Sequence, residues 1–406
     1  MGVKDFDQNR LSLEEVGHFY GGLSGKSGKD FGKGNSRYIT FLNVINNIVA
    51  RIELTELVEI EKSEQQNKVS AGDLLFNGSS ETPEEVAFPS LVTKELEGFY
   101  LNSFCFGFRF EKFDRLDPLF FAYYLRSQYG RQFMSQLAQG STRYNISKTA
   151  LLKLEWTLPD LSEQKVIAEA LSDIDGLIES TKALKTKKIM IKKGYLDSII
   201  SGETFTSRAI KIKLAEYLEF FNGYSFQSST YSNTGHYLIR ISNVQSGQLV
   251  RNDDVCVNLE NSKLKQFELN AGDIVISLTG NVGRSAIIEH KNIPAALNQR
   301  VGKIEIKINK VKMLNKKYFY QILQSQKFMD LVIEMGEGAA QKNVSLRDIG
   351  SIEWYIPEDS QEQLRISNFL NDLDNEIDLL GNALQKYELL KQGIMNDLLT
   401  GKVSLV

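Results

Sequence analysis

The segment Ile352-Glu353-Trp354-Tyr355-Ile356-Pro357 has the same pattern as an earlier segment, Leu154-Glu155-Trp156-Thr157-Leu158-Pro159. The two copies lie about 200 residues apart, which is the mark of an internal repeat. Each copy is followed by a Glu-Gln pair, Glu163-Gln164 in the first and Glu362-Gln363 in the second. The sequence therefore predicts, at two places, the end of a globular part followed by the start of a helix.

Further matches keep their order along the two halves of the chain. The ordered pairs are Val69–Leu75 with Leu269–Val275, Gly140–Ser147 with Gly338–Ser345, and Ser201-Gly202 with Thr400-Gly401. Matches that keep their order over a whole repeat are hard to produce by chance. One polypeptide is therefore expected to hold two copies of a globular part plus a helix.

The globular parts alternate short β-rich runs, such as residues 237–241, with helical patches, such as residues 318–323. This mixture is typical of α+β domains. We expect two tandem α/β domains separated by two long helices, which pair as an antiparallel coiled coil in a pseudo-two-fold arrangement. The expected boundaries are a first domain at 1–158, a first helix at 159–205, a second domain at 206–356 and a second helix at 357–406.

Apolar residues in the two helical segments recur at alternating steps of four and three residues, the pattern of a coiled-coil seam. The heptad is regular in the second helix and loosens in the first, through Leu184 and Ile191. Asp160 with Glu163 and Asp359 with Glu362 resemble capping boxes at the helix starts. Gly202 and Gly401 suit the helix ends. The expected interface residues are Ile167, Leu171, Ile174, Ile178, Leu373, Ile377, Leu380 and Leu384.

Charge suggests how the two helices lie together. The first helix is acidic at its start and basic at its end, where Lys182–Lys193 holds six lysines, whereas the second helix is acidic over 362–378. Antiparallel pairing places the acidic start of the second helix against the basic end of the first. The alternative is that both are solvated faces, since exposed ion pairs contribute little.

Composition limits the function classes. With 42% hydrophobic and 24% charged residues the chain is that of a folded protein. It has no apolar run of the length that a membrane helix needs and no apolar stretch after MGVKDFDQNR, so we expect a cytoplasmic protein with no membrane partner. Its two cysteines and three histidines show neither metal-ligand spacing nor a catalytic arrangement, and we expect no metal site, no catalytic residue and no cofactor in this chain.

The repeated motifs resemble those of the specificity subunit of type I restriction-modification enzymes, over nearly the whole chain. The resemblance is carried by the Trp-x-x-Pro and Glu-Gln motifs of both halves, by Ala271–Val275 with Thr279–Gly283, and by Asn298-Gln299-Arg300-Val301. It implies a non-catalytic protein with two target-recognition domains, each binding one half of a bipartite double-stranded DNA site. It also implies that the helices dock two methyltransferase subunits, that restriction subunits join them, and that S-adenosylmethionine, ATP and Mg²⁺ bind in those partners.

Polar and basic residues in glycine-rich turns are the candidate DNA contacts, because glycine lets the backbone approach DNA closely. In the second domain they are Ser277, Thr279, Asn281, Arg284, Gln299, Arg300, Lys342 and Asn343. In the first domain they are Lys26, Lys29, Asn77, Ser79, Ser80, Arg143 and Tyr144. The first domain lacks an Asn-Gln-Arg motif, and its residues 76–81 replace the Thr-Gly-Asn-Val-Gly loop.

The chain as a whole is slightly acidic, with 48 Lys and Arg against 51 Asp and Glu. Residues 206–356 are basic, with 19 Lys and Arg against 14 Asp and Glu. Because affinity for DNA scales with the phosphates neutralised, we expect tight binding to need the partner methyltransferases. Two other hypotheses remain: a nuclease with a hidden carboxylate site, and a purely structural coiled-coil adaptor.

Overall fold

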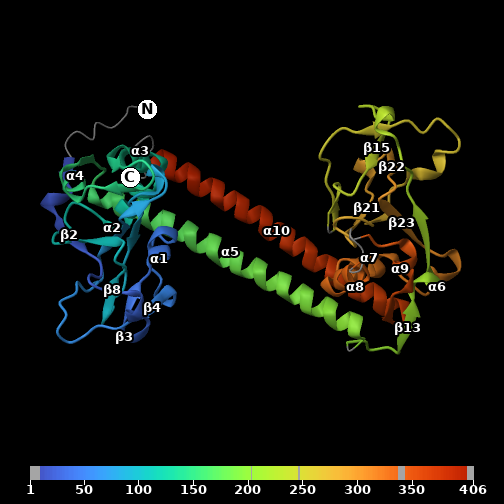
Figure 1. Cartoon of the computed structure of the whole chain (residues 1–406), viewed down its shortest axis with the longest axis horizontal. Coiled ribbons are helices and arrows are strands. Elements are labelled where there is room, and N and C mark those ends of the chain that lie inside the picture. Colours follow the sequence, from blue (N-terminus) through green and yellow to red (C-terminus); the bar gives the residue numbers. More distant parts are fainter. Residues whose placement is uncertain (1–9, 203, 246, 337–342, 400–406) are drawn as a thin grey trace. The chain divides into compact units, whose positions relative to one another are not determined.

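The computed structural model describes residues 10–202, 204–245, 247–336 and 343–399. The chain forms two compact units, residues 1–181 with 383–406 and residues 182–382. Each unit holds one globular domain and half of each of the two long helices (Figure 1). The units therefore do not follow the sequence repeat, because each long helix is shared between them.

The first globular domain contains twelve strands and four α-helices in its described part. The strands are β1 (Arg10–Ser12), β2 (Gly17–Gly21), β3 (Phe31–Ile39), β4 (Thr55–Val58), β5 (Leu74–Asn77), β6 (Ser79–Ser80), β7 (Pro89–Leu91), β8 (Phe99–Leu101), β9 (Cys105–Phe110), β10 (Ala138–Gln139), β11 (Tyr144–Ile146) and β12 (Glu155–Thr157). The helices are α1 (Phe41–Asn46), α2 (Pro118–Arg126), α3 (Gln128–Leu137) and α4 (Lys148–Lys153).

The second globular domain repeats this plan. Its strands are β13 (Ala209–Lys213), β14 (Leu218–Asn222), β15 (His236–Ile239), β16 (Val244–Gln245), β17 (Gln248–Leu249), β18 (Cys256–Val257), β19 (Glu268–Leu269), β20 (Ile274–Ser277), β21 (Ser285–Ile287), β22 (Ala295–Leu297), β23 (Val301–Ile306) and β24 (Glu353–Pro357). Its helices are α6 (Leu214–Tyr217), α7 (Lys316–Leu323), α8 (Gln326–Gly336) and α9 (Leu346–Ser351).

The sheets of the two domains have equivalent topology. The antiparallel order β2-β9-β5-β7 in the first domain matches β14-β23-β20-β21 in the second. Each domain contains a parallel strand pair, β3 with β8 in the first and β15 with β22 in the second. Short strands that precede each long helix, β12 and β24, pair with β1 and β13 at the start of their domains. The predicted mixed α and β fold and the duplication are both confirmed.

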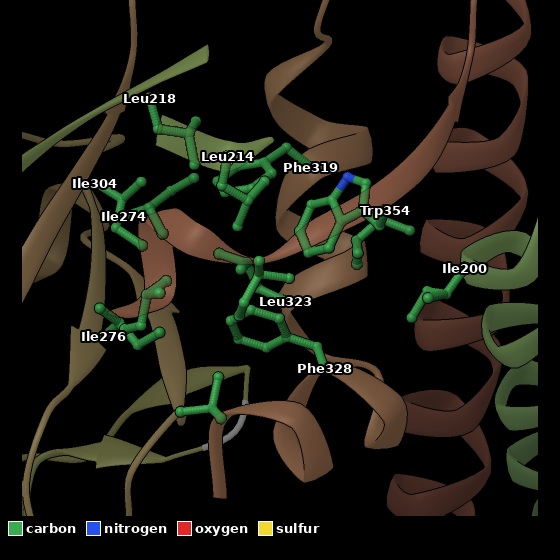
Figure 2. Packing of buried hydrophobic residues seen from close by; sticks show 14 of the residues in the cluster. Ile200, Leu214, Leu218, Ile274, Ile276, Ile304, Phe319, Leu323, Phe328 and Trp354 are labelled. Carbon is green, nitrogen blue, oxygen red and sulfur yellow. The ribbon is translucent and has the colours of Figure 1, made fainter. Parts of the chain in front are cut away.

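Each domain is built around a tryptophan from the repeated motif. Trp354 lies among Phe319, Leu323 and Phe328, and is 3% exposed (Figure 2). Trp156 occupies the same place in the first domain and packs against Phe121 with ring centroids 5.3 Å apart. The motif is thus the point where the last strand, β12 or β24, meets the helices.

The Glu-Gln motif ties each long helix to its domain. Gln363 accepts a hydrogen bond from the backbone N–H of Asn315 (2.8 Å) and donates to the carbonyls of Met313 (2.8 Å) and Pro357 (2.9 Å). Its side chain is fully buried. Asn315 in turn caps α7 with its own side chain. In the first domain Gln164 makes the same three bonds with Asp117, Arg115 and Pro159.

Replacing Gln363 with leucine is expected to destabilise the second unit by about 2–5 kcal/mol, because the backbone N–H of Asn315 and the carbonyls of Met313 and Pro357 lose the partner that the buried amide supplies. Urea unfolding followed by circular dichroism measures the change. Gln361→Leu is the matched control, since Gln361 is exposed and bonds to Asp359 through its backbone only. Equal midpoints for the two variants would contradict the role of the buried amide.

The long helices are α5 (Leu161–Ser201) and α10 (Ser360–Leu398), drawn in green and red in Figure 1. Ion pairs show that they run antiparallel within each unit. Lys192 binds Asp374 (2.5 Å) and Lys188 binds Glu376 (2.5 Å) in the second unit. Lys391 binds Asp175 (2.6 Å) in the first. The predicted antiparallel pairing is confirmed, and these charges are paired rather than merely solvated.

The expected seam residues differ in how deeply they are buried. Ile167, Leu171, Ile174 and Leu373 are buried, whereas Ile178, Ile377, Leu380 and Leu384 are partly exposed. Apolar contact is densest near the globular domains. There the start of one helix and the end of the other join the domain core, through Ile167, Leu171, Leu398 and Leu399 in the first unit and through Ile199, Ile200, Ile366 and Leu370 in the second.

The extension of the α5 seam through Leu184 and Ile191 is wrong, because these residues are 44% and 41% exposed. Lys188 and Lys192 occupy the contact side instead, and their ammonium groups reach carboxylates on α10. The spacing of apolar residues alone could not show that the side with Lys188 and Lys192, and not the side with Leu184 and Ile191, contacts α10.

The capping prediction holds for the aspartate of each pair, because Asp160 and Asp359 both accept a hydrogen bond from a backbone N–H in the first turn of their helix. Asp160 accepts from the backbone N–H of Glu163 (2.9 Å), as an N-cap does. Glu362 instead accepts from the backbone N–H groups of Thr206 (2.6 Å) and Ser207 (2.8 Å), which precede β13. Burial alone would raise the pKa of Glu362, but these hydrogen bonds outweigh it and lower the pKa to about 2. The expected helix end at Gly401 lies outside the described residues.

Candidate nucleic-acid interface

Three loops meet at one edge of the second domain. The turn after β20 contacts the loop before β23, where the Leu278 N–H donates to the Arg300 carbonyl (3.0 Å). The same turn contacts the segment before α9, where Thr279 forms a β-bridge with Asn343 and Val344 N–H donates to the Leu278 carbonyl (3.0 Å). Residues 277–281, 298–300 and 343–344 thus form one continuous surface, which we call the second loop cluster.

Most candidates of the second domain lie on this cluster with exposed side chains. Asn281, Gln299, Arg300 and Asn343 are exposed, and Thr279 is partly exposed. Arg284 is also partly exposed and donates to the side chain of Gln245 (2.6 Å). Ser277 is fully buried and bonded to the carbonyl of Asn281 within the turn. Lys342 lies outside the described residues.

Glycines allow the turn after β20 to fold so tightly. Gly280 and Gly283 have φ values of 73° and 82°, a region that disfavours residues with a side chain. A Cβ on Gly283 would lie 3.2 Å from the side chains of Met329 and Val332 on α8. Gly280 and Gly283 are therefore required by the turn and its packing, and the turn presents Asn281 to solvent.

Three equivalent loops meet in the first domain. Gly78 N–H donates to the carbonyl of Phe104 (2.7 Å), and β6 (Ser79–Ser80) pairs with Tyr144 and Asn145 of β11. Residues 77–80, 102–104 and 143–145 thus form the first loop cluster. Because both clusters use the turn after an equivalent strand, β5 or β20, the duplication extends to the arrangement of the loops.

Several candidates of the first domain have little exposed surface in this arrangement. Asn77 is fully buried, and its side chain binds the backbone of Ser79, Glu85 and Phe88. Ser79 and Ser80 are 7% and 8% exposed. These three side chains stabilise the turn and offer almost no surface to DNA, as does Ser277. Arg143 is exposed and Tyr144 is partly exposed.

Lys26 and Lys29 belong to a different loop. The ammonium group of Lys26 pairs with Glu64, and its side chain is only 5% exposed. Ser24 and Gln66 join the same two segments through hydrogen bonds. Lys29 is exposed. The contacts of this loop are with residues 61–66, so it is not part of the first loop cluster.

Phe104 was not among the predicted contacts, although it occupies the place of Arg300. Asn102 N–H donates to the carbonyl of Ile39, and Asn298 N–H donates to that of Ile239, so Asn102-Ser103-Phe104 is the equivalent of Asn298-Gln299-Arg300. Phe104 is 59% exposed, and the guanidinium of Arg143 lies 5.7 Å from its ring centre. The shared Leu-Asn step before β9 and β23 is the sequence signal that could have identified it.

Two partly buried arginines hold the loop behind the first cluster. Arg126 and Arg131 lie over the ring of Phe88 at 5.0 and 4.5 Å, and donate to backbone carbonyls of residues 84–89. Burial lowers the pKa of both to about 10, so both remain charged at neutral pH. This loop includes Ala87, whose φ is 55°, and it holds Asn77 in place.

Other kinds of site are not indicated. Among the described residues, no group of three or more His, Cys, Asp and Glu side chains gathers as metal ligands. In the same part of the chain, no helix combines the length and apolarity needed to cross a membrane.

Comparison with known families identifies the class of protein. The model of the family described as "Type I restriction modification DNA specificity domain" matches residues 10–189 and 210–389. Because the two matches cover most of the chain, the chain belongs to this family, as a tandem pair of DNA specificity domains. It is a specificity subunit of a type I restriction-modification system, the non-catalytic component that recognises DNA. The predicted family and class are confirmed.

Two archaeal relatives and one solved structure are similar to this chain. The type I restriction enzyme MjaVIII specificity subunit of Methanocaldococcus jannaschii is 28% identical over 307 residues, which cover 71% of each chain. The putative MjaX specificity subunit of the same organism is 27% identical over 404 residues, 94% of this chain and 90% of that protein. The crystal structure of the S subunit from M. genitalium matches with a TM-score of 0.58 at 18% identity, over 96% of this chain and 95% of that one, and this likeness shows the fold.

Proposed function

We propose that each globular domain recognises one half of a bipartite site in double-stranded DNA through its loop cluster. One observation supports this most directly: both domains bring three equivalent loops together, although the loops differ in sequence. Equal scaffolds with different loop side chains are what two different half-sites require, since base edges are distinguished by the side chains that reach them.

The exposed side chains of the clusters are the proposed DNA contacts. Arginine suits the acceptors of guanine, and asparagine and glutamine suit adenine, whereas an exposed phenylalanine can contact the methyl group of thymine. Lys29 remains a candidate for a phosphate contact outside the clusters. The proposed base contacts are Phe104, Arg143 and Tyr144 in the first domain and Thr279, Asn281, Gln299, Arg300 and Asn343 in the second. Arg284, which is partly exposed and lies outside the second loop cluster, is a further candidate.

Substituting Arg300 with alanine is expected to relax recognition at one position of the second half-site, because the loss of one base contact removes about 1–3 kcal/mol of discrimination. Phe104→Ala is expected to relax one position of the first half-site. Mapping of methylated adenines in cells that carry each variant with its cognate methyltransferase measures both changes.

Matched controls for these variants come from the same domains. Arg251→Ala removes an arginine that is 57% exposed and lies outside the second loop cluster, and Phe113→Ala removes a 53% exposed phenylalanine outside the first. Both controls should leave the methylated sequence unchanged. If Arg300→Ala and Phe104→Ala also leave every target position unchanged, base recognition by the loop clusters is excluded.

We further propose that the helices dock two methyltransferase subunits. In the second unit, one side of the helix pair is apolar although it faces solvent. Leu184 and Ile191 lie seven residues apart on α5, so they project from the same side. Tyr195 follows four residues later, and its ring contacts that of Phe369 on α10, 5.0 Å away. These four residues form what we call the apolar helix face.

An apolar patch of this kind on a soluble protein marks an interaction surface. We expect the methyltransferases to bring S-adenosylmethionine, and restriction subunits that join them to bring ATP and Mg²⁺. All of these are expected to act in the cytoplasm, where the chain meets cellular DNA. Tight DNA binding is expected only in the assembled complex, because the chain as a whole is slightly acidic, with 51 Asp and Glu against 48 Lys and Arg.

A further inference from the structure

A three-way polar contact joins the first globular domain to both long helices. The hydroxyl of Tyr123 on α2 donates to one oxygen of Asp175 on α5 (2.8 Å). The ammonium group of Lys391 on α10 donates to the other oxygen (2.6 Å) and lies 5.6 Å from the Tyr123 ring centre. Burial and the neighbouring Asp175 carboxylate raise the pKa of Tyr123, so its hydroxyl remains a donor at neutral pH.

The second unit contains the same contact at equivalent positions. Gln321 on α7 donates to one oxygen of Asp374 on α10 (3.1 Å), and Lys192 on α5 donates to the other (2.5 Å). Asp175 and Asp374 each lie eleven residues after the glutamine of a Glu-Gln motif. A tyrosine and a glutamine thus reach the same acceptor in the two domains. The two domains keep the same hydrogen bond to the carboxylate although the donor side chain differs, which indicates that the hydrogen bond has a structural role in both.

The position of this contact along the helix gives each domain a second attachment point. Apolar residues attach each domain to its helix near the helix start, at Ile167 and Leu171 in the first unit and at Ile366 and Leu370 in the second. The carboxylate lies four to eight residues further on, which is about 6–12 Å along the helix axis. A single attachment point would allow the domain to tilt, whereas two points along the axis fix its angle.

The ion pairs are sheltered enough to contribute. Side-chain exposure is 30% for Asp175 and 27% for Lys391, and 39% for Asp374 and 17% for Lys192. Each carboxylate also accepts a neutral hydrogen bond from its domain. Partly buried pairs within such a network are screened less than isolated surface pairs.

We propose that Asp175 and Asp374 are positioning residues, which fix the angle of each globular domain on the helix pair and thereby restrict the spacing between the two half-sites. This inference rests on the proposed recognition of a bipartite site. Successive base pairs are about 3.4 Å apart along DNA, so a small tilt at the helix moves the loop cluster by a comparable distance.

The test uses the complete complex with its methyltransferases and three DNA duplexes. One carries the cognate site, and the others have one base pair added to or removed from the spacer. Asp175→Asn and Asp374→Asn are each expected to leave methylation of the cognate site within a few-fold of wild type. They should raise methylation of the altered spacers, relative to the cognate site, by about tenfold.

Controls separate positioning from folding. Asp173→Asn and Asp372→Asn make the same charge change at exposed neighbours on the same helices and should leave the spacer ratio unchanged. Tyr123→Phe removes only one hydroxyl and should change the ratio in the same direction as Asp175→Asn. The exchange Asp175→Lys with Lys391→Asp restores the ion pair and should partly restore the ratio.

The outcomes distinguish failure of the positioning role from failure of the proposed function. A spacer ratio equal to that of wild type in Asp175→Asn, Asp374→Asn and Tyr123→Phe overturns the inference, whether or not the cognate rate falls, since a fall alone indicates a merely structural role. If instead the wild-type complex methylates without any bipartite preference, the proposed function fails, and that result is seen before any variant is made.

Discussion

Trp354→Ala is expected to destabilise the second globular domain strongly, with a loss of about 3–5 kcal/mol. The indole lies between β24 and the helices α7 and α8, with ring centroids 5.9 Å from both Phe319 and Phe328. A domain has about 5–15 kcal/mol of stability in total, so a cavity of this size removes a large share of it. Thermal unfolding and urea denaturation measure the loss, and methylation should lose its dependence on the second half-site.

Neighbouring substitutions test whether packing is the cause. Tyr355→Ala alters the adjacent residue, which is 39% exposed, and should cost much less. Trp354→Phe should also be milder, because the indole N–H has no hydrogen-bond partner among the described residues and leaves none unpaired. A Trp354→Ala variant as stable as Tyr355→Ala would contradict the account of the core.

Leu184→Glu combined with Ile191→Glu is expected to weaken association with the methyltransferase by a factor on the order of 100, because burying two carboxylates in an apolar interface is costly. Both side chains are more than two-fifths exposed, so the specificity subunit itself should stay folded. Isothermal titration calorimetry and size-exclusion chromatography with the cognate methyltransferase measure the change.

A matched control lies on the opposite side of α5. Thr186 and Lys193 are exposed and also lie seven residues apart, and a helix turns about 100° per residue, so they project away from the apolar helix face. Thr186→Glu with Lys193→Glu should leave association nearly unchanged. If both double variants bind the methyltransferase like wild type, the apolar helix face of the second unit is not a docking surface.

Local pattern was sufficient for much of the architecture. The repeat at Trp156 and Trp354 and the two long helices follow from sequence period, which is a property of neighbouring residues. The antiparallel pairing was predicted from the repeat and from the charges along the two helices. The Glu-Gln motif also marked its site correctly, although its contacts were unforeseen. Gln363 lies where the chain leaves β24 for α10, and its bonds to Met313 and Asn315 join segments about 50 residues apart in sequence.

The candidate site was predicted less completely, because it depends on which loops meet. The glycine-rich turn pointed to Asn281 and Arg300, and both are exposed on one surface. The same reasoning predicted Asn77 and Ser277 as DNA contacts, but their side chains turn inward and bind the backbone of their own turns. It passed over Phe104, because the phenylalanine side chain is neither polar nor basic.

Periodicity and repetition are properties of the chain alone, so two related domains and two long paired helices could be predicted from the residues. The structure was needed to show that each compact unit takes half of both helices, that Asp175 and Asp374 each join three elements, and that Phe104 lies where Arg300 does. These features depend on contacts between segments far apart in sequence, which are brought together by the parallel strand pairs β3–β8 and β15–β22 and by the antiparallel helices.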